Sequence, residues 1–183
     1  ENALLFDARS QLHAYALSKI PKDGFVLEFG VFNGDSINAL ADAFTLMKDP
    51  RQIFGFDSFE GLQEDWVGHE CLAGTFDRQG TLPSVRDSVT LIPGWIDRTL
   101  PAFLSSHQDP IALLHIDTDT YTPCKLILEL VEARLRPGSV IIFDELLAYP
   151  GWQYGEHKAL CETVSKPYSF IAFSGHHAAL VMN

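Results

Sequence analysis

Short apolar runs that alternate with amphipathic stretches constrain the fold of this chain more than any other feature. The runs occupy residues 26–29, 53–56, 89–92, 111–116 and 139–143. The last two read IALLHI and SVIIF and show almost no alternation of apolar and polar residues. Continuous apolar strands are typical of a parallel sheet buried on both faces. The pattern therefore predicts a single α/β domain over residues 1–183 with a Rossmann-like, doubly wound fold.

Helical spacing predicts the covering elements over residues 35–47, 97–104, 123–134 and 155–164. The carboxy-terminal segment differs, because YSFIAF at 168–173 and HHAALVM at 176–182 are separated only by Ser174 and Gly175. So short a connection predicts an antiparallel hairpin. With this hairpin, the sheet is expected to have seven strands and to be mostly parallel.

Residues 58–88 form a long segment that does not follow the alternation of apolar runs and amphipathic stretches. They have weak periodicity and several turn residues, namely Gly61, Gly68, Gly74, Gly80 and Pro83. A loop this long within a compact domain is usually functional or mobile. We therefore expect a flap near the ligand, with a short helix near residues 83–87.

Composition limits the partners. The formal net charge of −11 repels phosphate backbones and anionic lipid, which argues against nucleic acid and membrane surfaces as partners. No apolar run approaches the roughly 20 residues of a membrane span. Cys71, Cys124 and Cys161 form no C-x-x-C pair and are expected to be reduced thiols of a cytoplasmic protein. The sequence leaves open whether the chain forms a homo-oligomer.

Acidic residues follow the predicted strands at the edge where ligands bind in a doubly wound sheet. They are Glu28, Asp57, Asp117, Asp119, Asp144 and Glu145. Any one of them alone could be a helix cap or a loop acid. Together they predict a functional site at this edge.

The first of these strand ends, VLEFGVFNGDS at residues 26–36, is similar to a dinucleotide-binding loop. Phe32 replaces the second glycine of G-x-G-x-x-G, where a pyrophosphate must approach the backbone closely. A ligand without phosphate, such as S-adenosylmethionine (SAM), needs less clearance. Its carboxylate can meet the amides near Gly34 and Ser36, and its ribose diol can bind Asp57.

A second set, Asp117, Asp144 and Glu145, could present oxygen ligands to one Mg²⁺ ion, which would acidify a substrate hydroxyl. The alternative is that these residues are separate loop acids that bind SAM or cap helices. His115 lies within an apolar strand and is expected to be an ordinary core residue.

The segments LEFGVFNGDS, FGFDSFEGL, IPGWIDRTLP, LLHIDTDTYTPC and PGSVIIFDEL resemble those of class I SAM-dependent methyltransferases, and within them the macrocin O-methyltransferase family. The resemblance covers roughly residues 24–165 and implies O-methylation of a small-molecule hydroxyl of the sugar or natural-product type. It also implies a set of cofactor-binding residues, namely Glu28, Gly30, Phe32, Asn33, Ser36, Asp57, Ser58, Gly94, Trp95 and Asp117.

The resemblance further implies Asp117, Asp144 and Glu145 as Mg²⁺ ligands, and Asp117 or Asp119 as the catalytic base. The chain departs from the family pattern in three places. It has Asp144-Glu145 where Asp-Asp is usual, the hairpin with His176 matches poorly, and the lid before residue 20 is expected to be short or missing. Two alternatives stay open: a non-catalytic SAM-binding domain, and an NAD(P)-dependent oxidoreductase, against which Phe32 argues.

Overall fold

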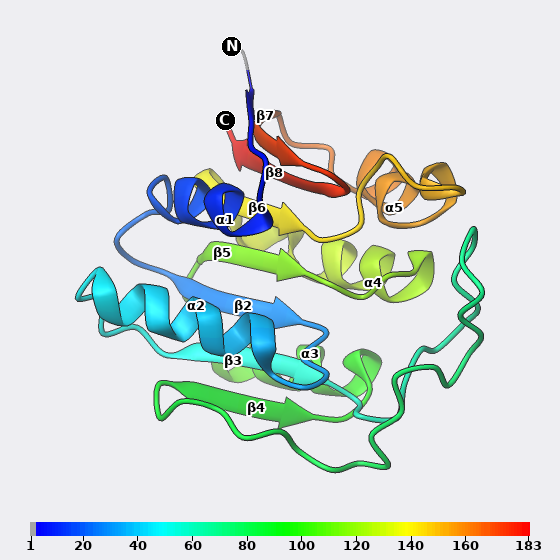
Figure 1. Cartoon of the computed structure of the whole chain (residues 1–183). Coiled ribbons are helices and arrows are strands. Elements are labelled where there is room, and N and C mark those ends of the chain that lie inside the picture. Colours follow the sequence, from blue (N-terminus) through cyan, green and yellow to red (C-terminus); the bar gives the residue numbers. More distant parts are fainter. Residues whose placement is uncertain (1–2) are drawn as a thin grey trace.

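One mixed sheet of eight strands runs through residues 3–183, the part of the chain that the computed structural model describes (Figure 1). The strands are β1 (Leu4–Leu5), β2 (Phe25–Phe29), β3 (Ile53–Asp57), β4 (Val89–Pro93), β5 (Ile111–Ile116), β6 (Leu135–Phe143), β7 (Tyr168–Ser174) and β8 (His177–Met182). Their spatial order is β1-β7-β8-β6-β5-β2-β3-β4.

The pairing confirms the Rossmann-like class with its carboxy-terminal hairpin. Strands β2 to β6 pair only in parallel with one another, whereas β8 is antiparallel to both β6 and β7. The expected strand number of seven is wrong by one. Leu4 and Leu5 pair with Ala172 and Phe173 and add a parallel edge strand to β7. Two residues are too few to show a periodic pattern in the sequence.

Helices cover both faces of the sheet (Figure 1). One face carries α1 (Arg9–Leu17) and α2 (Asp35–Leu46). The other carries α3 (Ile96–Ser106), α4 (Tyr121–Val131) and α5 (Glu156–Thr163), with two 3₁₀ turns at Glu132–Arg134 and Trp152–Tyr154. The sequence did not predict α1. The helix expected near residues 83–87 is absent from the described chain, where this segment is irregular.

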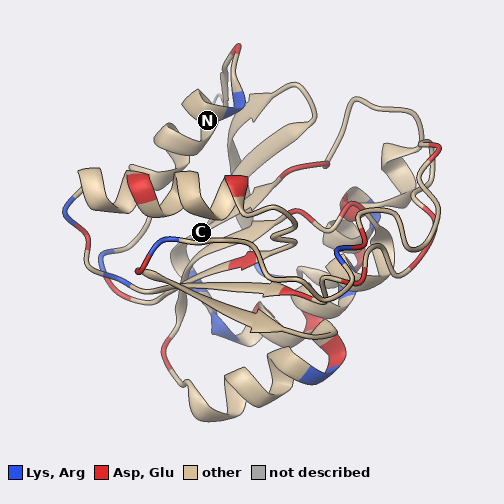
Figure 2. Cartoon of the chain, turned by 60° about the horizontal axis from the view of Figure 1, so that its bottom comes forward, with Lys and Arg blue, Asp and Glu red and all other residues tan. Residues whose placement is uncertain are grey.

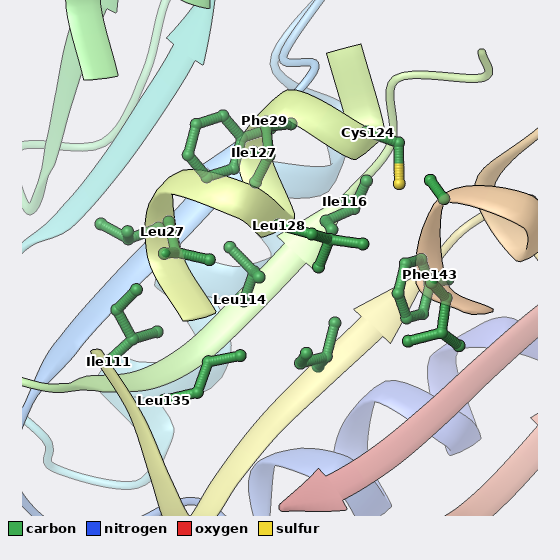
Figure 3. Close-up of a cluster of buried hydrophobic side chains, with 14 of the residues drawn as sticks. Leu27, Phe29, Ile111, Leu114, Ile116, Cys124, Ile127, Leu128, Leu135 and Phe143 are labelled. Atoms are coloured by element: carbon green, nitrogen blue, oxygen red, sulfur yellow. The ribbon is translucent and has the colours of Figure 1, made fainter. Parts of the chain in front are cut away.

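The core lies between the sheet and these two helical layers. Every residue of β5 is buried, and its Leu114 and Ile116 pack toward Ile127 and Leu128 of α4 (Figure 3). Burying a side chain of this size stabilises the fold by about 1.5–3 kcal/mol. The central strands are therefore a rigid base for the loops that follow them.

Strand β2 marks the point where the chain changes direction across the sheet. From β2 the chain builds β3 and β4 on one side, and it then returns to place β5 and β6 on the other. In open α/β sheets the ligand crevice lies at such a switch point, beyond the carboxyl ends of the strands. Here those ends belong to β2 and β5.

Acidic residues are spread over helices and loops on several sides of the molecule, with fewer basic residues between them (Figure 2). Within residues 3–183, no helix is both long and apolar enough to cross a membrane.

Candidate functional site

A cleft of about 370 Å³ lies at the switch point. Its walls come from the β2–α2 loop, the ends of β3, β5 and β6, the start of α3, and the flap, which we define as residues 58–88. Ten of the predicted site residues line it: Gly30, Phe32, Asn33, Ser36, Asp57, Ser58, Trp95, Asp117, Asp119 and Glu145. Glu28, Gly94 and Asp144 are not among the residues that line it.

Gly30 lets the ends of β2 and β5 come together. It has a φ of +86°, and a Cβ atom at this position would lie 1.7 Å from the carbonyl oxygen of Asp117. Glycine adopts this conformation without steric cost, and the close carbonyl leaves no space for a Cβ atom. The close approach brings the β2–α2 loop and Asp117 to the same cleft.

Glu28 supports the loop from below. Its side chain is fully buried, and its two carboxylate oxygens accept hydrogen bonds from the Ser36 hydroxyl at 2.7 Å and from His115 Nδ1 at 2.9 Å. Both oxygens are thus engaged inside the protein. This geometry gives Glu28 a role in positioning Ser36, while a direct contact with a cofactor stays a prediction.

Asp57 fixes the β2–α2 loop from the neighbouring strand. One carboxylate oxygen accepts the amides of Val31 and Phe32, each at 2.8 Å, and the other accepts the amide of Phe59 at 2.7 Å. An ionised carboxylate offers about four acceptor positions. Asp57 therefore holds the loop and still faces the cleft with acceptor capacity. The amide of Gly94 in turn donates to the Asp57 carbonyl at 2.9 Å, which places Trp95 in the cleft wall.

Phe32 lies at the rim of the cleft, where the β2–α2 loop meets the flap. It is 40% exposed, has a φ of +44°, and its ring centroid lies 5.3 Å from that of Phe76. The Arg78 guanidinium lies 5.9 Å from the Phe32 ring and donates a hydrogen bond to Asn33 Oδ1. The aromatic residue that replaces the second glycine thus contacts the flap and does not pack under α2.

The flap forms part of the cleft, as its length suggested. It contributes Gly61, Leu62, Gln63, Trp66 and Phe76 to the lining. Glu64 holds it against α4, because its carboxylate accepts the Thr122 amide at 2.7 Å and the Thr122 hydroxyl at 2.6 Å.

Two aspartates from the end of β5 have raised pKa values. Burial and the charge of Asp144 raise the pKa of Asp117 well above its usual range. Burial, together with Glu145 and Asp144, raises the pKa of Asp119 to about 7. Asp119 also has a φ of +62° and lines a second pocket of about 400 Å³ between the flap and the start of α5. It therefore stands where two pockets meet.

Glu156, at the start of α5, is a site residue that sequence reasoning missed. It is fully buried, and its carboxylate accepts the amides of Thr118 at 3.3 Å and Glu145 at 3.2 Å. It thereby connects the loops that follow β5 and β6. Burial and the charge of Asp117 raise its pKa well above the usual range. The one feature of the sequence that could have pointed to Glu156 is its place in the first turn of a predicted helix, but acids are common there because they stabilise the helix end.

Replacement of Glu156 by glutamine tests whether this side chain holds the loops after β5 and β6 together. A Glu156→Gln variant keeps one acceptor oxygen but places an NH₂ group against the second amide. Leaving a buried amide unpaired costs about 1–3 kcal/mol. We expect a loss of that size in the free energy of unfolding, measured by urea titration. The matched variant Glu129→Gln, at an exposed position of α4, should change it by less than about 0.5 kcal/mol.

The predicted metal ligands are not the set that the structure gathers most tightly. In the part of the chain that is described, the His, Cys, Asp and Glu side chains whose donor atoms all lie within 4.8 Å of one another are His13, His115 and Asp144. Asp117 and Glu145 are not members of this group. Arg9 Nη1 donates to both oxygens of Asp144 at 3.1 Å, and His177 Nδ1 lies 3.1 Å from one of them.

Arg9 and His13 belong to α1 and were not foreseen. They lie four residues apart and thus on one face of this helix. The sequence RSQLHAYAL does place Leu12 and Ala16 at helical spacing, and both are buried. That spacing was the signal that could have revealed the helix.

Comparison with known proteins gives consistent results. A family model described as "Methyltransferase domain" matches residues 27–146. A crystal structure of the calicheamicin methyltransferase CalS11 is 27% identical over 92% of this chain and 76% of that chain, with a TM-score of 0.75. An apo structure of CalS11, described as a TDP-rhamnose 3'-O-methyltransferase, is 28% identical over 93% of this chain and 76% of that one, with a TM-score of 0.67.

The O-methyltransferase NovP shares the fold, with a TM-score of 0.65 and 18% identity over 95% of this chain and 77% of its own. A search of curated protein sequences finds no match.

Proposed function

Because the chain belongs to the methyltransferase domain family, as a class I SAM-dependent methyltransferase, we propose that it methylates a hydroxyl group of a small-molecule acceptor. The observation that carries this proposal is the position of Asp119. This residue lines both the cleft at the switch point and the pocket beside it. A cofactor in the first space and an acceptor in the second would meet at its carboxylate.

The cleft has the chemistry that SAM requires. SAM supplies a methyl group on a positively charged sulfonium. The charged residues that line the cleft are acidic apart from Arg9, namely Asp35, Asp57, Asp117, Asp119 and Glu145. Such a surface favours a cation. The first amides of α2, beginning after Gly34, would receive the cofactor carboxylate.

Asp119 is the proposed general base. It would accept the proton of the acceptor hydroxyl as that oxygen attacks the methyl carbon, while the bond from this carbon to the sulfonium breaks and S-adenosylhomocysteine leaves. Its positive φ is uncommon for a residue other than glycine, and such strain is concentrated at functional sites. Glu156 would position Asp119 indirectly, through the amide of the preceding Thr118.

A sugar-type acceptor, as in the macrocin family, is the favoured class. The second pocket is lined by Trp66, Tyr121 and Tyr154 together with polar residues such as Lys158. Aromatic rings beside polar groups suit a sugar or a natural product that carries hydroxyls. The identity of 27–28% with CalS11, which acts on a TDP-sugar by its description, points the same way.

Magnesium does not fit the side chains as they are placed. The donor atoms of Asp117 and Glu145 do not join those of Asp144 in a compact set within the described residues. The set that is compact contains two imidazoles, whereas Mg²⁺ prefers oxygen ligands. We therefore assign no step to Mg²⁺.

Binding and turnover test the proposal separately. Calorimetry should show saturable binding of SAM and none of NAD, and a panel of nucleotide-sugar acceptors should yield a methylated product. Absence of SAM binding at millimolar concentration would overturn the proposal. SAM binding without turnover of any acceptor would favour the non-catalytic alternative.

The role of Asp57 in this cleft is tested by Asp57→Ala. The change removes three hydrogen bonds to loop amides and the acceptor for the ribose diol. Because hydrogen bonds to charged groups contribute about 1.5–3 kcal/mol each, we expect SAM affinity to fall about tenfold or more. Asp87→Ala, at an exposed aspartate outside the cleft, should leave the affinity unchanged. Equal affinities for the two variants would remove Asp57 from the binding site.

A further inference from the structure

Two histidines and an aspartate meet beneath Arg9, and none of the three lines the cleft. His13 comes from α1, His115 from β5, and Asp144 from the residue that follows β6. The donor atoms of these three side chains all lie within 4.8 Å of one another. The rings of His13 and His115 meet edge to face, with centroids 5.1 Å apart. The cluster thus joins three separate parts of the fold.

The nitrogens that face this cluster have no hydrogen-bond partner. Nε2 of His13 and Nε2 of His115 are both buried and unpaired among the described residues. The His115 side chain is only 2% exposed, and its Nε2 lies 3.8 Å from Asp144 Oδ1, too far for a hydrogen bond. Buried polar groups nearly always have a hydrogen-bond partner, so these two unpaired nitrogens indicate that a ligand binds between them.

Glu28 prepares His115 for that partner. Its carboxylate lies 2.9 Å from His115 Nδ1, on the opposite side of the ring from the free nitrogen. A carboxylate that accepts the proton of one ring nitrogen leaves the other as a lone-pair donor, and this arrangement is usual behind histidines that bind metals. Burial lowers the pKa of His115, but the carboxylates of Asp144 and Glu28 outweigh it and raise that pKa well above its usual value, so a metal ion would displace a proton from this ring.

We propose that His13, His115 and Asp144 form a binding site for a divalent transition metal of the Zn²⁺ type. Imidazole ligands suit zinc and its neighbours, whereas magnesium and calcium prefer oxygen. Ligands of one zinc ion lie closer together than 4.8 Å, so a modest contraction closes the site. His177 Nδ1, 3.1 Å from Asp144 Oδ1, is the nearest candidate for a fourth ligand.

The metal would attach α1 to the carboxyl edge of the sheet. Arg9, one turn before His13, donates to the same aspartate, but its side chain is 44% exposed and can turn toward the cleft. Metal binding would thereby release the basic residue of the cleft wall toward the ligand. This inference does not depend on the proposed methyl transfer.

Titration with Co²⁺ and Zn²⁺ tests the site. We expect one Co²⁺ per chain with the visible absorption of imidazole coordination, displaced by Zn²⁺. Saturating Zn²⁺, at about 100 times its Kd, should raise the melting temperature by about 5 °C or more. His13→Ala should weaken Zn²⁺ binding by about 100-fold or more, since even residues that only support metal ligands contribute 10–100-fold. His69→Ala, at an exposed histidine of the flap, should leave it unchanged.

Two further variants separate this site from the acidic one. Asp117→Asn and Glu145→Gln should keep the Co²⁺ spectrum and the Zn²⁺ affinity, because neither residue belongs to the cluster. Loss of binding in these two variants with retention in His13→Ala would overturn the proposal, as would absence of any stoichiometric Zn²⁺ binding in the native chain. His13→Gln, which keeps a polar side chain of similar reach, and far-ultraviolet circular dichroism would separate ligand loss from misfolding.

Discussion

Replacement of Asp119 by asparagine should lower kcat about 10²–10⁴-fold and leave the affinity for SAM within about threefold of the native value. The reason is that the amide has the size of the carboxylate but cannot accept a proton at neutral pH. Asparagine also tolerates positive φ, so the backbone at φ +62° need not change. Steady-state kinetics with a methylated acceptor, combined with SAM calorimetry, would measure the two effects.

A control separates the missing base from a missing charge. Asp97→Asn removes one negative charge from the exposed first turn of α3, outside both pockets. It should keep kcat and SAM affinity at native levels. If Asp119→Asn lost SAM affinity in proportion to kcat, the residue would be a cofactor ligand and another group would have to act as base.

Much of the site could be predicted because parallel strands bring distant residues to one edge. A buried parallel strand appears in the sequence as an unbroken apolar run, and the first polar residue after it lies at the carboxyl edge. Asp57 and Asp117 were found in this way and line the cleft, and after β6 it is the second acid, Glu145, that lines it rather than Asp144. The reasoning needs only the strand ends and the handedness of the connections.

The contributions of the helices could not be predicted by the same argument. His13 meets His115 across 102 residues of sequence, and Glu156 reaches the Thr118 amide across 38. Neither strand periodicity nor a local motif encodes such pairs. They depend on how each helix is rotated against the sheet, which packing decides.

Tertiary contacts also explain the absence of a helix near residues 83–87. The Asn38 side chain donates to the Ser84 carbonyl at 3.0 Å and accepts the Arg86 amide at 2.9 Å. Arg86 in turn forms two hydrogen bonds to Asp42 at 2.8 and 2.9 Å. Bonds to α2 replace those that a helix would form within this segment, and they hold the end of the flap against the helix that begins at the cleft.

Gly30→Ala should be the most damaging single-methyl change at the site. The new Cβ would lie 1.7 Å from the Asp117 carbonyl oxygen, and the backbone φ is +86°. A left-handed conformation costs alanine about 1–2 kcal/mol, and relief of the overlap requires the ends of β2 and β5 to separate. We expect a total loss of about 3–5 kcal/mol in the free energy of unfolding. In a chain of this length, that corresponds to a fall of about 10 °C in the melting temperature.

Gly80→Ala isolates the two causes of this loss. Gly80 also has a positive φ, of +71°, but a Cβ there meets no atom within 4 Å. Its substitution should therefore cost only the conformational strain of about 1–2 kcal/mol. The remaining loss in Gly30→Ala measures the close approach of β2 to β5, and SAM affinity should fall with it because the loop and Asp117 share this contact. Equal losses in urea unfolding of the two variants would show that β2 and β5 can separate at no cost. The position of Asp117 in the cleft would then not depend on the glycine.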